Sequence, residues 1–173
     1  MVIIMKITRQ QRKEIIELLK VIGVTFIAFR YFLMSIRISG KSMMPTHVDG
    51  ERGIMFRKTP FNLIKYNDVV VVKLSVEKSL LIKRVIGLPN DTIEIKDNAV
   101  YVNDRKITDK YRMIDSYLKK HSKVSLKDDE YFVLGDNREN SKDSRVFGAI
   151  KGDNIIAVNG IIYYPLAKIG LTK

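Results

Sequence analysis

The chain of 173 residues contains no cysteine and two histidines, His47 and His121. Without cysteine there is no disulfide framework, no thiolate zinc site and no cysteine nucleophile. The two histidines lack the spacing of a ligand pair, so we expect no metal ion and no organic cofactor. At this length the chain fits one domain, or a small domain behind an N-terminal anchor, and it can bury a core without a metal or disulfide.

The charge of the chain is strongly unbalanced, with a formal net charge of +12 at pH 7. Its basic residues are nevertheless scattered and interleaved with acids, and they form no dense block and no known nucleic-acid motif. A basic balance also suits an anionic membrane surface. We therefore expect a phospholipid membrane, and not nucleic acid, among the partners.

An apolar run over residues 15–36 follows a basic leader, residues 1–14. A helix of about 20 residues crosses the roughly 30 Å hydrocarbon core of a bilayer, so the run is long enough to span it. Arg30 lies toward the far end, where its side chain can reach the interface. The run predicts a single transmembrane anchor, and an interfacial amphipathic helix or a buried core helix are the alternatives.

The basic leader also predicts the topology of the protein. Positively charged segments beside an anchor stay in the cytoplasm, which places residues 1–14 inside and residues 37–173 outside the cell membrane. No small-x-small cleavage site follows the apolar run, so we expect the anchor to be retained. The predicted organisation is a single-pass membrane protein with one extracytoplasmic domain.

After Thr46 the apolar segments become short, and turn residues separate them, as in antiparallel sheets. The expected strands are residues 54–56, 69–74, 80–86, 92–96, 99–102, 131–134 and 155–164. Asp97-Asn98 predicts a hairpin turn, and Asn159-Gly160 predicts either a bulge or a break in the last strand. Residues 105–130 are polar and weakly patterned, which is typical of an inserted loop or small subdomain. The fold class is mainly β, an antiparallel sheet behind one helix.

The first stretch that can carry chemistry is SGKSMMPT, residues 39–46, which contains Ser42. A serine hydroxyl becomes a nucleophile when a base removes its proton, whereas most isolated serines only shape a turn or cap a short helix. Gly40 permits close backbone approach and Pro45 stiffens the exit from the turn. The backbone N–H groups of Gly40 and Lys41 are expected to be free to bind an oxyanion.

The second stretch is LLIKRVIG, residues 80–87, with Lys83 at its centre. In a strand, Lys83 shares one face with Leu81 and Val85, so its side chain lies among apolar neighbours. The ordinary alternative is an edge-strand lysine whose ammonium group reaches water. A desolvated lysine instead acts as a general base, and lowering its pKa to about 7–8 requires roughly 4 kcal/mol of bias against the charged form.

The third stretch, GDNRENSKDSR at residues 135–145, is dense in short hydrogen-bonding side chains. It is either a hydrophilic surface loop with internal salt bridges or a support for the site. In the second case one of its hydroxyl or carboxamide groups orients the lysine amine.

Together and in this order, SGKSMMPT, IKRVIGLPND and GDNRENSKDSRVFG resemble the sequence boxes of the type I signal peptidases, which are membrane-bound serine–lysine endopeptidases. The resemblance covers roughly residues 14–165 and implies a signal peptidase-like sheet. It implies that Ser42 is the nucleophile, that Lys83 is the general base and that Ser141 hydrogen-bonds and orients the lysine. Asp143 and Arg145 match the structural ion pair of the family.

The resemblance further implies that the Ser42 backbone N–H binds the oxyanion, and that Gly40 stands where some members carry a serine donor. It implies cleavage of exported preproteins after small-x-small sites at the outer membrane surface, with no cofactor. The residues expected to shape the shallow substrate pockets are Met43, Met44, Val85 and Ile86.

Three positions depart from the family pattern. His47 replaces a common leucine, Glu51 replaces a common aspartate and Asn90 stands where a glycine is frequent. Asparagine tolerates the left-handed backbone region, so the turn at Asn90 is expected to form. We expect these changes to affect substrate preference and not the chemistry. The short polar segment at 105–130 resembles the compact Gram-positive-type members.

Two other readings of the sequence are open. Cytoplasmic self-cleaving repressors also pair a serine before methionine with a downstream lysine, but the apolar run and the GDNR stretch argue against that class. A non-catalytic relative that acts as a chaperone or assembly factor is the other alternative. Such a protein is expected to lack the serine or the lysine, and both Ser42 and Lys83 are present.

Overall fold

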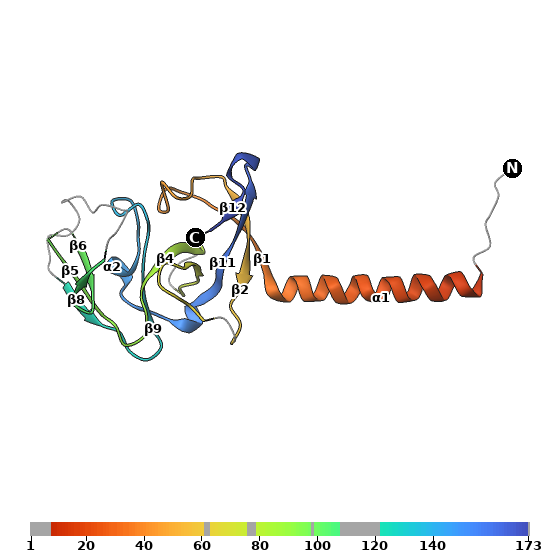
Figure 1. The fold of residues 1–173 in the computed structure, drawn as a ribbon, viewed down its shortest axis with the longest axis horizontal. Coiled ribbons are helices and arrows are strands. Elements are labelled where there is room, and N and C mark those ends of the chain that lie inside the picture. The colour runs from red at the N-terminus through yellow and green to blue at the C-terminus, as the bar shows by residue number, and fades with distance from the viewer. Residues whose placement is uncertain (1–7, 61–62, 76–78, 98, 108–121, 173) are drawn as a thin grey trace. The chain divides into compact units, whose positions relative to one another are not determined.

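The structure is a computed structural model that describes residues 8–60, 63–75, 79–97, 99–107 and 122–172. The chain divides into two units, which meet between Leu33 and Met34. The first contains a single long helix, and the second contains the strands and short helices (Figure 1).

The long helix α1 covers Arg9–Phe32. It begins there because Thr8 and Gln11 form a reciprocal capping box: the Thr8 side chain accepts a hydrogen bond from the Gln11 N–H, and the Gln11 side chain accepts one from the Thr8 N–H. None of its residues is buried, so its apolar side chains lie exposed.

The helix ends four residues before the predicted anchor does. Residues Leu33–Arg37 form strand β1, in which Met34 and Ile36 pack against buried side chains of the sheet, so the end predicted at residue 36 is wrong. No helix in the described parts of the chain combines the length and the apolar character that crossing a membrane requires.

The larger sheet has eight strands in the order β1-β2-β11-β3-β4-β9-β10, with β12 paired to β11. The pairs from β2 through β10 are antiparallel, which confirms the predicted fold class. The bounds after β1 are β2 (Arg52–Arg57), β3 (Val69–Val72), β4 (Leu81–Gly87), β9 (Glu130–Leu134), β10 (Ile150–Lys151), β11 (Ile155–Tyr164) and β12 (Gly170–Leu171).

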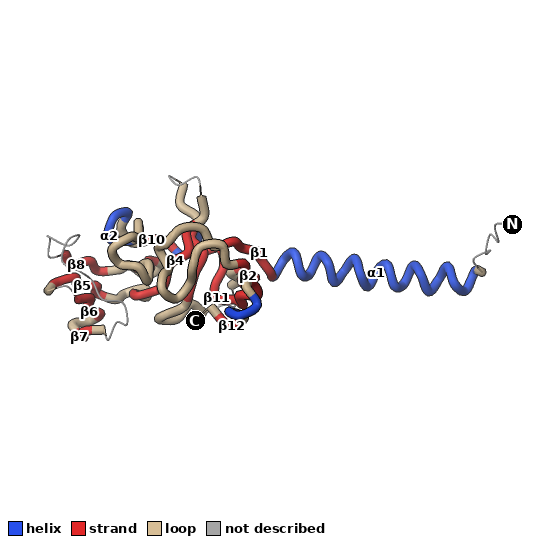
Figure 2. Tube along the Cα trace, turned by 90° about the horizontal axis from the view of Figure 1, so that it is seen from above, coloured by secondary structure: helices blue, strands red, loops and turns tan. Residues whose placement is uncertain are grey.

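The smaller sheet has four strands in the order β7-β6-β5-β8 (Figure 2). Their bounds are β5 (Thr92–Lys96), β6 (Ala99–Val102), β7 (Arg105–Lys106) and β8 (Ser122–Ser125). The β5–β6 hairpin confirms the prediction. Strand β8 pairs antiparallel with β5, so the end of the 105–130 segment belongs to a sheet and not to a separate insert. The middle of that segment lies outside the described residues.

Strand β11 contains the predicted bulge at Asn159-Gly160, where its register with β2 shifts. Asn159 has a positive φ of 49°, and its side chain accepts the Val69 N–H at 3.0 Å, which satisfies a backbone group at the bulge. A side chain at Gly160 would collide with the Ile54 carbonyl, so glycine permits this close strand approach.

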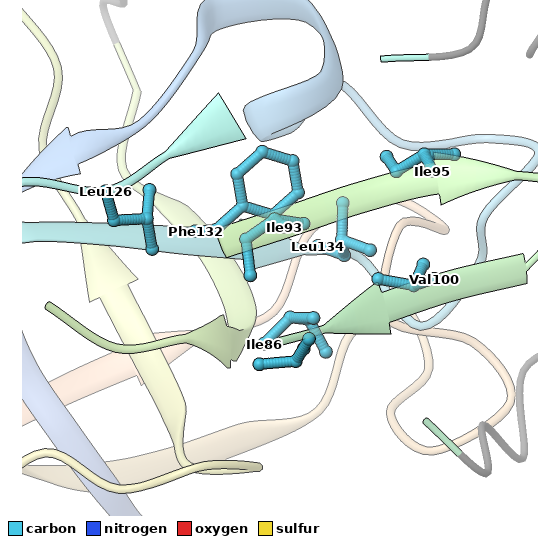
Figure 3. Close-up of a cluster of buried hydrophobic side chains, with 8 residues drawn as sticks. Ile86, Ile93, Ile95, Val100, Leu126, Phe132 and Leu134 are labelled. Carbon is cyan, nitrogen blue, oxygen red and sulfur yellow. The ribbon is translucent and has the colours of Figure 1, made fainter. Parts of the chain in front are cut away.

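Three clusters of buried side chains form the core. One lies between the two sheets, where Ile86 of β4 and Phe132 and Leu134 of β9 meet Ile93 and Ile95 of β5 (Figure 3). The second contains Val70, Val72, Val85 and Val133. The third contains Met43, Met55, Val69, Val71 and Ala157.

The valines of β3 alternate between the second and third clusters, so both faces of this central strand are buried.

The remaining elements of the larger unit are short helices. Their bounds are α2 (Ser144–Phe147), η1 (Gly152–Asn154) and η2 (Leu166–Lys168).

Candidate active site

The turn that carries Ser42 is closed at its base by two backbone hydrogen bonds. The Ile38 N–H donates to the Glu51 carbonyl at 2.8 Å, and the Gly50 N–H donates to the Ile38 carbonyl at 2.9 Å. Gly40 adopts a positive φ of 89°, and its N–H donates to Asp49 Oδ1 at 2.9 Å. The Gly40 N–H is therefore engaged, and the expectation that it is free for an oxyanion is wrong.

Asn137 holds the same turn from the polar stretch that follows β9. Its backbone N–H donates to the Ser42 carbonyl and its side-chain amide donates to the Lys41 carbonyl, both at 3.0 Å. Sequence reasoning expected a side chain of this stretch to orient the lysine. Asn137 instead fixes the backbone of the serine turn, a contact across 95 residues of chain for which the sequence carries no local signal.

Lys83 lies on β4, opposite Val70 of β3 and flanked on the same face by Leu81 and Val85. The lysine is 2% exposed, and its Nζ lies 2.9 Å from Ser42 Oγ. The structure thus brings together the two residues that the sequence singled out, from positions 41 apart in the chain.

The environment of Lys83 disfavours its charged form. The pKa of the amine is lowered from 10.5 to about 8, and burial is the largest cause. The Arg145 charge acts in the same direction, whereas Asp143 and Asp136 raise the pKa. An amine with a pKa of about 8 is neutral in roughly one molecule in ten at pH 7, several hundred times more often than an amine with the ordinary pKa of 10.5. In that form its lone pair can accept the Ser42 proton across the observed contact.

Asp143 is fully buried and joins three parts of the site. It caps α2, it accepts the Gly135 N–H at 3.0 Å and its carboxylate pairs with Arg145 through two contacts of 2.8 Å. The expected ion pair between Asp143 and Arg145 is present. Its bidentate geometry fixes the segment from Gly135 to Arg145 beside the serine turn.

Ser141 has a buried hydroxyl that makes no hydrogen bond with any described residue. The hydrogen bond from Ser141 to Lys83 that the resemblance implies is therefore not formed in this structure. The hydroxyl packs closely on Gly135, where a side chain would collide with both Ser141 Oγ and the Ser42 carbonyl. Glycine at position 135 thus allows the polar stretch to approach the serine turn.

A second buried ion pair lies next to Lys83 in sequence but was not predicted. Arg84 binds Asp136 through two contacts of 2.7 Å, and it also donates to the Asn67 carbonyl at 2.8 Å. Both side chains are nearly inaccessible to solvent. The alternation of β4 places Arg84 on the opposite face from Lys83, which is the signal that could have suggested a buried partner.

Three of the four predicted substrate-pocket residues belong to the core. Met43, Val85 and Ile86 are 1%, 0% and 5% exposed and pack in the three apolar clusters. In this structure they therefore contribute mainly to the core, and their role in substrate pockets stays a prediction. Met44 alone is partly exposed. Across the described residues, no three acidic or histidine side chains gather as metal ligands.

Comparison with known proteins places this arrangement in a family context. The family described as "Signal peptidase, peptidase S26" matches residues 12–164. "Signal peptidase I T" of Bacillus subtilis strain 168 is 34% identical over 158 residues, which cover 83% of this chain and 81% of that protein. "Signal peptidase IB" of Staphylococcus aureus strain COL is 35% identical over 184 residues, covering 91% and 93%.

A solved structure of a signal peptidase I from Enterococcus faecalis V583 also matches. It is 26% identical, with a TM-score of 0.49, and the match covers 56% of this chain and 97% of the other.

The burial of Lys83 predicts that the free energy of unfolding depends on pH. The variant Lys83→Met, which cannot titrate at this position, tests this prediction. Because the pKa of Lys83 is about 8 in the folded protein and 10.5 in an ordinary lysine, the unfolded chain binds more protons between these pH values. The wild-type free energy of unfolding should therefore rise relative to that of Lys83→Met between pH 8 and 10.5. From pH 10.5 down to pH 8 the stability difference should change by about 3 kcal/mol in favour of the variant, because a 1-unit shift is worth about 1.4 kcal/mol.

Urea unfolding of both proteins at several pH values measures this difference. Lys151→Met, which removes an exposed lysine of β10, is the matched control and should show no such pH dependence. A difference between wild type and Lys83→Met that stays constant from pH 7 to 10.5 would contradict the assignment of a desolvated amine.

Proposed function

This chain belongs to the signal peptidase family, peptidase S26, and we propose that it cleaves signal peptides with Ser42 as nucleophile and Lys83 as general base. The observation that carries the proposal is the 2.9 Å contact between Lys83 Nζ and Ser42 Oγ, made by a lysine that is buried among apolar side chains. Its substrates are exported preproteins, which it cuts after small-x-small sequences.

In the first half of the reaction, neutral Lys83 removes the Ser42 proton while Oγ attacks the scissile carbonyl carbon. The carbonyl oxygen becomes an oxyanion and the lysine becomes an ammonium. Collapse of this intermediate breaks the C–N bond, and the lysine returns its proton to the leaving amine. The product of this half is an ester on Ser42 and a free mature N-terminus.

In the second half, Lys83 takes a proton from a water molecule that attacks the ester. The C–O bond to Ser42 breaks, the serine recovers a proton from the lysine and the signal peptide leaves with a new carboxylate. One peptide bond and one water are consumed, and no redox partner or cofactor enters the cycle. The enzyme returns to its starting protonation state.

The oxyanion of the intermediate is bound by the Ser42 backbone N–H. No described residue accepts a hydrogen bond from this group, so it is available to a substrate carbonyl. Asn137 supports this role, because its hydrogen bonds to the Lys41 and Ser42 carbonyls hold the peptide units before and after the Ser42 Cα. Gly40 supplies no side-chain donor, and the oxyanion relies on the backbone.

In this proposal, the Ser141 hydroxyl accepts a hydrogen bond from Lys83 when the lysine is protonated. Its hydroxyl is buried without a partner in the described structure, and a buried hydroxyl is costly to leave unbonded. Protonation of Lys83 during the reaction creates three donors where the neutral amine had two. The Ser141 oxygen is an acceptor for one of them, which stabilises the transient charge.

We further infer that α1 holds the protein at the cell membrane, with the N-terminus cytoplasmic and the catalytic domain outside, although α1 falls short of the apolar character of a typical membrane span. The supporting observation is that many apolar residues of α1 are exposed, because an exposed apolar surface is typical of a site that contacts a membrane or another protein. Arg9, Arg12 and Lys13 precede the apolar residues and favour the cytoplasmic side.

The proposed chemistry predicts loss of cleavage in Ser42→Ala and Lys83→Ala. Detergent-solubilised protein is incubated with a preprotein that carries a small-x-small site, and the mature product is quantified. Each variant should lose about 1,000-fold or more in kcat/KM, because neither half of a serine–base pair works alone.

The matched controls are Ser125→Ala and Lys151→Ala, which remove an exposed serine and an exposed lysine from other strands. Both should cleave like wild type. Retention of cleavage by Ser42→Ala or Lys83→Ala would eliminate the proposed pair, and a wild type that cleaves no preprotein would favour a non-catalytic role.

The proposed location predicts that alkaline carbonate leaves the protein in the membrane pellet and that detergent releases it. The double variant Ile22→Lys/Phe26→Lys places two charges on the exposed apolar surface of α1 and should shift the protein to the supernatant. Gln10→Lys, at the polar start of the helix, is the control and should stay in the pellet. Release of the wild type by salt alone would contradict the location.

A further inference from the structure

Glu51 is a buried carboxylate at the base of the serine turn, and it contacts two other groups that can carry positive charge. It is 2% exposed, and its Oε2 lies 3.0 Å from Nδ1 of His47, which is also buried. Its Oε1 lies 3.1 Å from Nζ of Lys168, which comes from η2 near the end of the chain. The Lys168 contact is an ion pair and the His47 contact a hydrogen bond, and such charged partners make a carboxylate this deeply buried tolerable.

The contacts around Glu51 keep it ionised. Burial raises the pKa of the carboxyl group, but the Lys168 and His47 contacts outweigh it and leave the pKa below its ordinary value. An ionised carboxylate only accepts hydrogen bonds, so Nδ1 of His47 carries the proton in this contact. The tautomer and the ring orientation of His47 are thereby fixed by Glu51.

His47 connects the Glu51 carboxylate to the serine turn. Its backbone N–H donates to the Met43 carbonyl at 2.9 Å, and Met43 directly follows Ser42. The Met43 side chain is itself locked in the core, between Met55 and the valines of β3. A displacement of His47 would therefore be transmitted to the peptide units next to the nucleophile.

We propose that Lys168, Glu51 and His47 form a positioning network that sets the orientation of Ser42 toward Lys83. The inference rests on the proposed function. Lys168 is the outermost member, 42% exposed at its side chain, and it acts through Glu51 and His47. Two residues that depart from the family pattern, His47 and Glu51, are thus each other's partners, and Lys168 supplies the balancing charge.

A positioning role makes a kinetic prediction that a purely structural role does not. If the network loosens, Ser42 samples orientations in which Oγ is out of reach of the lysine lone pair, while substrate contacts elsewhere stay intact. The chemical step then slows and substrate binding does not change, so kcat falls at constant KM. A role in overall stability alone would leave kcat unchanged below the melting temperature.

The test compares Lys168→Met, which keeps length and removes charge, with Lys168→Arg, which restores a cation. Preprotein cleavage is measured with the full chain in detergent, at least 20 °C below the lowest melting temperature of the set, a margin chosen to keep every variant folded. Lys168→Met should lose about 5- to 20-fold in kcat with KM within about twofold of wild type, and Lys168→Arg should recover to within about twofold. Lys151→Met is the matched surface control and should match wild type.

Glu51→Gln is measured in parallel, because it removes the charge that Lys168 contacts while keeping the size of the side chain. It should show the same fall in kcat, and it decides the question if Lys168→Met does not fold. Wild-type kcat in either folded variant, or a loss in Lys168→Met that Lys168→Arg fails to recover, would overturn the network while leaving the serine–lysine pair standing. A wild type without any cleavage would instead remove the proposed function on which the network rests.

Discussion

The site depends on keeping one lysine out of water. Lys83 lies on a strand whose same-face neighbours are apolar, opposite Val70 of a strand that is buried on both sides. This burial is the first cause of its lowered pKa, which is about 8. The bias corresponds to about 3 kcal/mol, a large part of the net stability of a typical domain. Burial of Lys83 therefore lowers the free energy of unfolding, and the packing of the rest of the sheet offsets this cost.

The charges around Lys83 largely offset one another, so burial determines the direction in which its pKa shifts. Asp143 and Asp136 both raise the pKa of the amine, and together they could keep it protonated. Each carboxylate, however, is bound by an arginine in bidentate geometry, Asp143 by Arg145 and Asp136 by Arg84. The paired arginines offset the field of the carboxylates, and Arg145 itself lowers the lysine pKa. The ion pairs thus hold the loop in place without restoring the charge of the base.

The sequence allowed the central pairing to be predicted, but not its setting. Alternation along residues 80–86 placed Lys83 among apolar neighbours, and turn residues located the β5–β6 hairpin and the bulge of β11. The features that were not predicted depend on contacts between distant parts of the chain. The end of α1 depends on Met34 and Ile36 packing on the sheet. Strand β8 forms by pairing with β5, and Met43 is buried because it packs against the valines of β3. Local patterns contain none of this information, and the same holds for the contact of Asn137 with the serine turn.

The most direct test of the account is the pH dependence of kcat/KM for preprotein cleavage, measured over a range in which the protein stays folded. The profile reports the ionisation of the essential base in the free enzyme. Because the reactive form of Lys83 is the neutral amine, activity should be low in acid and should rise with an apparent pKa near 8. A rise centred near 10, as for a lysine in water, would contradict the claim that burial beside Ser42 prepares the base.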